Sequence, residues 1–65
     1  MNALQKIPDY VVYYKYQGMT LDHYFSIPED RPGMYPIECA EIELLKLYPH
    51  PRLERIIILD TYKYR

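Results

Sequence analysis

The sequence predicts an α+β fold of ββαβ type, in which one helix packs on one face of a three-stranded antiparallel sheet. Two segments rich in Tyr and branched residues, 9–17 and 19–27, flank a glycine turn. A helical pattern begins at Pro36, and a third apolar segment covers 53–64. The simplest antiparallel connection places the third strand beside the first, which gives the spatial order 2-1-3.

The length of 65 residues predicts a single domain over 1–65. A domain of this size buries only about 60% of the surface that its unfolded chain exposes, so an additional source of stability is expected. Cys39 is the only cysteine, which excludes an internal disulfide, and its spacing from His23 and His50 does not fit a zinc site. We therefore expect no metal or cofactor. Association with another chain remains as the expected additional source of stability.

The first two predicted strands, 9–17 and 19–27, are expected to form an antiparallel hairpin. Gly18 can take the positive φ that a tight turn between them requires. On the second strand, alternation predicts that one set of side chains faces the core: Leu21, His23, Phe25 and Ile27. Alternation on the first strand is weaker. We interpret Val11 and Tyr13 as lying on the helix side with Phe25, which leaves Tyr10, Tyr14 and Tyr16 facing outward.

The helix follows a loop whose Pro32-Gly33 pair suits a type II turn. Pro36 fits the first helical turn, and the helix is expected to run to about Tyr48, before the Pro49-His50-Pro51 stop. Spacing at 100° places Glu43 and Lys46 on the solvent side. The predicted core face consists of Ile37, Ala40, Leu44, Leu47 and Tyr48.

A single helix leaves the second face of the sheet open, and that face would normally be polar. Here both faces of the first and third strands carry apolar or aromatic residues, and the chain has nine tyrosines. Tyrosine combines a large contact area with few rotatable bonds and a polar tip, which favours it at interfaces. The predicted partner-binding residues on the open face are Tyr10, Tyr14, Tyr16, Tyr62 and Tyr64.

Acidic residues gather in the middle of the chain, although the net charge is only −1. Acidic groups in a first helical turn are common because they complement the helix dipole. They also form a surface that would dock on a basic partner and accelerate association. The residues assigned to this second predicted binding surface are Glu29, Asp30, Glu38 and Glu41.

Enzymatic activity is not expected. Asp22 and His23 are adjacent in a strand and point to opposite faces, so Asp22 cannot orient His23. His23 is interpreted as a partly buried structural histidine. Cys39 and His50 would lie at opposite ends of the helix, about 15 Å apart. Binding of single-stranded nucleic acid by stacking on tyrosines is a weaker alternative, because the pI of about 6.0 argues against a groove that follows phosphates.

The predicted function is that of a small non-enzymatic protein-binding domain, an inhibitor or modulator of a larger host protein or nucleic-acid-processing enzyme with a basic or apolar surface. In element order and size the chain resembles several small phage-encoded proteins that inhibit host enzymes; this likeness covers the layout alone. The other alternative is a homodimer with the tyrosines at its own interface. The first residues carry no leader pattern and no apolar run spans a membrane, so a cytoplasmic location is expected.

Overall fold

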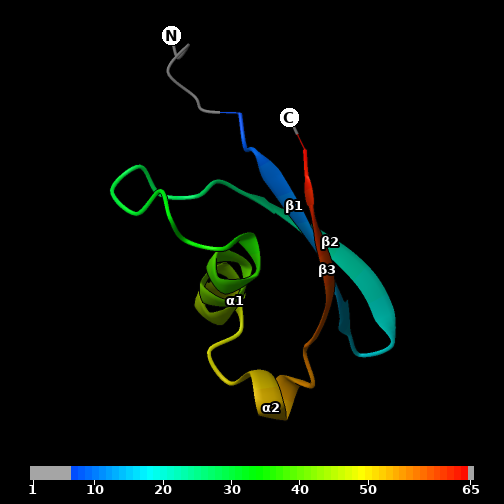
Figure 1. The fold of residues 1–65 in the computed structure, drawn as a ribbon. Helices are drawn as coiled ribbons and strands as arrows, with labels where there is room; N and C mark the ends of the chain where they lie inside the picture. Colours follow the sequence, from blue (N-terminus) through cyan, green and yellow to red (C-terminus); the bar gives the residue numbers. More distant parts are fainter. Residues whose placement is uncertain (1–6, 65) are drawn as a thin grey trace, which may run out of the picture.

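The computed structural model describes residues 7–64 and confirms the predicted fold class. The elements follow in the order β1 (Tyr10–Tyr16), β2 (Met19–Phe25), α1 (Pro36–Leu47), α2 (Pro51–Glu54) and β3 (Ile57–Lys63). Both strand pairs are antiparallel, and the sheet order is β2-β1-β3. Figure 1 shows α1 on one side of the sheet and no helix on the other.

A two-residue turn connects β1 and β2. Gln17 and Gly18 both have positive φ, 51° and 81°, as a type I′ turn requires. This turn places Tyr16 opposite Met19, and the register continues without a shift to Tyr10 opposite Phe25. Partners directly opposite each other lie on the same face of a sheet, so the face of Phe25 is also the face of Tyr10.

The segment that was predicted as the start of the third strand is helical instead. Residues 51–54 form the short helix α2, which ends at Arg55 in the left-handed conformation, with φ 58°. The strand begins only at Ile57, because the reversal at Arg55 must first return the chain to the edge of β1. The prediction of a strand from Leu53 is therefore wrong in its first four residues.

A β-bulge changes the faces of β3. Tyr13 pairs with Asp60, whereas Tyr14 pairs with Ile58, so Leu59 is the extra residue. Before the bulge, Ile58 faces α1; after it, Thr61 occupies the α1 side opposite Val12. The regular alternation of a β-strand is consequently broken at Leu59.

The core lies between the sheet and α1. Its buried members are Val12, Tyr14, Phe25, Cys39, Ala40 and Leu44. Of the predicted helix core face, Ala40 and Leu44 are buried and Tyr48, the residue that ends the helix, packs against the cluster. The prediction is wrong for Ile37 and Leu47, which lie in the first and last turns and are exposed, because only the middle of α1 is covered.

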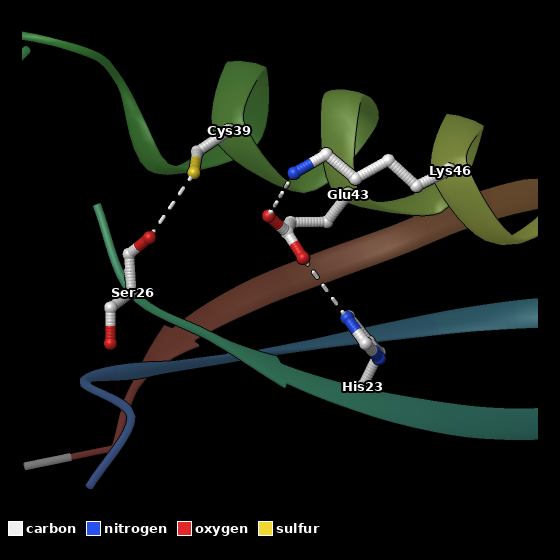
Figure 2. A network of polar contacts seen from close by, with 5 residues as sticks. All are labelled: His23, Ser26, Cys39, Glu43 and Lys46. Atoms are coloured by element: carbon white, nitrogen blue, oxygen red, sulfur yellow. Dashed lines mark hydrogen bonds and ion pairs between the residues drawn. The ribbon is translucent and has the colours of Figure 1, made fainter. Parts of the chain in front are cut away.

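Polar contacts attach α1 to β2, as Figure 2 shows. His23 Nε2 lies 3.3 Å from Glu43 Oε1, and Lys46 Nζ donates to Glu43 Oε2 at 3.4 Å. One turn earlier, Cys39 Sγ donates to the Ser26 carbonyl oxygen at 3.5 Å. Glu43 was expected on the solvent side, and it faces β2 because His23 provides a polar partner there. His23 itself is a partly buried structural residue, as predicted.

The prediction that Tyr10, Tyr14 and Tyr16 face outward is wrong. All three lie on the α1 side: Tyr14 is 4% exposed, and the other two pack against the core. Tyr10 stacks on Phe25 with ring centroids 5.8 Å apart. The physical reason is the hairpin register, which fixes these side chains to the face of Phe25.

The turn before α1 differs from the predicted type. The Met34 amide donates to the Arg31 carbonyl at 3.2 Å, so a turn does contain Pro32 and Gly33. Gly33 does not have the positive φ that a type II turn requires at this position. The conformational freedom of glycine is therefore not needed at this position.

Truncating a core residue tests the packing. Leu44→Ala removes a side chain that is 4% exposed, and we expect the free energy of unfolding to fall by about 2–5 kcal/mol. The matched control is Leu53→Ala, at 82% exposure, with an expected change within about 0.5 kcal/mol. Urea denaturation of both variants measures the difference, and equal losses would contradict the core described above.

The raised pKa of Tyr14 predicts that the folded state loses stability at alkaline pH. Burial and the 3.0 Å hydrogen bond between the Tyr14 and Tyr48 hydroxyls raise the pKa of Tyr14 to about 12, from 10.0. The folded state therefore favours the neutral hydroxyl, and the corresponding stability is complete below pH 10 and lost between pH 10 and 12. In Tyr14→Phe, unfolding free energies measured through this range should fall less steeply than in the wild type. Identical slopes would contradict the assignment.

Candidate functional site

Four tyrosines from all three strands gather on the sheet face that α1 does not cover. Tyr13, Tyr24, Tyr62 and Tyr64 are 36%, 44%, 54% and 52% exposed. Their rings are in contact across strands: Tyr13 and Tyr62 meet edge to face at 5.8 Å between centroids, and Tyr24 and Tyr64 do so at 4.8 Å. We call these four residues the tyrosine face.

Val11 lies beneath the tyrosine face. Its partners on the neighbouring strands are Tyr24 and Tyr62, and it is 6% exposed although no helix covers it. The Tyr24 and Tyr62 side chains therefore flank Val11 on both sides, and each of the two rings is in contact with a second tyrosine ring. Rings that are already ordered lose little conformational entropy on binding, which favours a recognition role.

Two carboxylates flank Tyr13, the residue of the tyrosine face that lies on the central strand. Tyr13 lies directly opposite Asp22 on β2 and opposite Asp60 on β3. Burial, followed by the charge of Asp22, raises the pKa of Tyr24. The negative charge of Asp60 is the main cause that raises the pKa of Tyr62. The face therefore combines aromatic rings, neutral hydroxyls and two negative charges.

The predicted tyrosines divide between the two layers. Tyr62 and Tyr64 are on the open face, whereas Tyr10, Tyr14 and Tyr16 lie under α1. Sequence analysis missed Tyr13 and Tyr24. The turn could have identified Tyr13: a two-residue loop at 17–18 puts Leu21 opposite Tyr14, and the adjacent Tyr13 then takes the other face.

The predicted acidic residues are exposed but belong to other parts of the molecule. Glu29 and Asp30 lie in the loop before α1, and Glu38 and Glu41 lie on α1 itself. Figure 1 shows α1 on one side of the sheet, and the strand pairing places the tyrosine face on the other side. The acidic residues of α1 and the tyrosines consequently do not form one continuous surface.

A groove of about 290 Å³ separates α1 from α2 and β3. Its lining is mainly apolar, with one carboxylate: Glu41, Leu44, Leu45, Pro51, Ile56 and Ile58. Pockets that hold drug-sized ligands usually measure about 300–1,000 Å³, so this groove is at the lower limit. Its lining brings no convergent polar groups together beyond the Glu41 carboxylate.

The side chains with catalytic potential have structural partners. Cys39 is buried, and burial is the main cause that raises the pKa of its thiol, so little of the reactive thiolate is present at neutral pH. His23 contacts Glu43 on the side of the sheet opposite Asp22. Over residues 7–64, no group of three or more His, Cys, Asp or Glu side chains is arranged to hold a metal ion. Within the same range, no helix has the length and apolar character needed to cross a membrane.

Comparison of the chain with protein-family models, curated proteins and solved structures finds no match.

The two carboxylates give a test of the geometry of the tyrosine face. Asp60→Asn removes the charge that contributes most to the raised pKa of Tyr62, and we expect this pKa to move down toward its ordinary value. Asp22→Asn is the matched control, since it should lower the pKa of Tyr24 and not that of Tyr62. Titration of the tyrosine ring resonances by NMR measures both. A Tyr62 pKa unaffected by Asp60→Asn would contradict the described contact.

Proposed function

We propose that this chain is a small non-enzymatic binding domain that engages a larger protein through the tyrosine face and acts as its inhibitor or modulator. The observation that carries this proposal is the set of four exposed tyrosines on one sheet face, whose rings contact one another across strands in two pairs. Ordered, exposed aromatic area of this kind is typical of interaction surfaces.

The contrast between the tyrosines under α1 and those of the tyrosine face supports the proposal. Tyr14 and Tyr16 use their hydroxyls within the fold: Tyr14 bonds Tyr48, and Tyr16 donates to Glu54 Oε1 at 3.0 Å. On the tyrosine face, the Tyr13 ring contacts Tyr62 and the Tyr24 ring contacts Tyr64, and all four side chains remain more than a third exposed. The tyrosine face thus offers ring area and hydroxyl groups that a partner can cover.

The acidic residues take a secondary role in this proposal. Asp30, Glu38 and Glu41 are exposed, and they add negative charge to the helix layer rather than to the tyrosine face. Their field would accelerate the approach of a basic partner, an effect that salt screens over about 10 Å. We place the interaction in the cytoplasm, where the single thiol of Cys39 would stay reduced.

The experiment is affinity capture of the tagged protein from a lysate of its native host, with the solution mass measured by light scattering. We expect a monomer that captures one stoichiometric partner. Because Tyr62 and Tyr64 are about half exposed and not part of the core, Tyr62→Ser with Tyr64→Ser should abolish capture while the fold persists. Circular dichroism of the double variant checks the fold.

The matched control is Tyr35→Ser, which removes a tyrosine that is 69% exposed and lies in the loop before α1. This variant should capture the partner as the wild type does. A stable dimer mass without a partner, split by the Tyr62→Ser and Tyr64→Ser changes, would instead show that the tyrosines form a homodimer interface.

A further inference from the structure

The most specific feature of the tyrosine face is the position of Tyr13 between two carboxylates. Tyr13 is on the central strand, with Asp22 opposite it on β2 and Asp60 opposite it on β3. Residues opposite each other in an antiparallel pair have Cβ atoms about 4.5–5.5 Å apart, so the Asp22 and Asp60 side chains leave the sheet on either side of Tyr13. Within residues 7–64, neither Asp22 nor Asp60 has an ion-pair partner.

The rings beside these carboxylates are arranged to accept a cation. Tyr13 and Tyr62 meet at an interplanar angle of 69°, so together they present ring faces in two directions. The face of an aromatic ring carries negative potential and attracts an ammonium or guanidinium group within about 6 Å of its centroid. On this sheet face, the next side chain after Tyr13 along β1 is a cation, Lys15. It lies opposite Thr20 and Ile57.

We propose that the tyrosine face binds a basic segment of the partner, with an arginine or lysine side chain seated against Tyr13 and Tyr62 between Asp22 and Asp60. This inference rests on the proposed function and adds the chemistry of the partner. Arginine fits best, because its planar guanidinium can stack on a ring while its edge donates hydrogen bonds to carboxylates.

The negative charges of Asp22 and Asp60 argue against two other occupants, a nucleic acid and a second copy of this chain. A nucleic acid would bring phosphates toward Asp22 and Asp60, and repulsion would oppose the stacking of bases on the rings. A second copy docked face to face would bring the Asp22 and Asp60 carboxylates of both chains together, which is also unfavourable. A cationic partner is the occupant whose charge complements this surface.

The direct test uses a defined probe. The isotopically labelled full chain is titrated by NMR with an acetylated, amidated peptide of alternating arginine and glycine, and with the same peptide carrying citrulline in place of arginine. Citrulline preserves the shape and removes the charge. We expect saturable shifts at Tyr13, Asp22 and Asp60 with the arginine peptide, and binding weaker by about fivefold or more with citrulline.

Variants separate the contributions of the rings and the carboxylates. Asp22→Asn combined with Asp60→Asn should weaken binding of the arginine peptide by about tenfold, whereas Tyr35→Ser, at an exposed position before α1, should change it by less than about twofold. Tyr13→Phe keeps a ring and should bind within about twofold of the wild type, and Tyr13→Leu should bind several-fold more weakly. The amide spectra of all variants establish that the fold is intact.

Three outcomes would overturn the inference: no saturable shift with the arginine peptide, equal affinity for the citrulline peptide, or tighter binding of a short oligothymidylate than of the arginine peptide. The proposed function is tested separately by lysate capture. If Tyr62→Ser with Tyr64→Ser abolishes capture and Asp22→Asn with Asp60→Asn does not, the binding function stands and the cationic partner is excluded.

Discussion

The register of the β1–β2 hairpin is the constraint on which the rest of this structure depends. Gln17 and Gly18, both at positive φ, form a two-residue turn that leaves no freedom in the pairing of the two strands. Once Phe25 faces the helix, its partner Tyr10 must do so as well, and every second residue of β1 follows. The division of the tyrosines into a buried set and an exposed set begins at this turn.

The bulge at Leu59 completes that division. Without it, Tyr62 and Tyr64 would share the face of Ile56 and Ile58, which pack against the core under α1. One extra residue reverses the alternation and turns both tyrosines to the open face, beside Tyr13 and Tyr24. Bulges commonly redirect side chains next to functional sites, and this one assembles the tyrosine face from three strands.

The buried and exposed tyrosines perform different tasks with the same side chain. Under α1, the hydroxyls of Tyr14 and Tyr48 share a hydrogen bond, and the Tyr16 hydroxyl donates one to Glu54. These hydrogen bonds attach the helical region to β1. On the open face, rings pack over Val11 and leave hydroxyls and ring area accessible. A small domain without a disulfide among its described residues thereby uses aromatic contacts both for stability and, in our proposal, for recognition.

The sequence by itself determined the fold class, the strand order, the start of α1 at Pro36 and an open sheet face rich in tyrosine, because local propensities and proline positions specify these. It also contained the hairpin register, through the two-residue turn, although alternation along β1 is too weak to select a face and our interpretation placed Val11 and Tyr13 on the wrong one. Only the tertiary structure decided the bulge at Leu59, the helix α2 and the approach of Asp22 and Asp60 to Tyr13. These depend on pairings between residues distant in sequence, which no local pattern in either strand specifies.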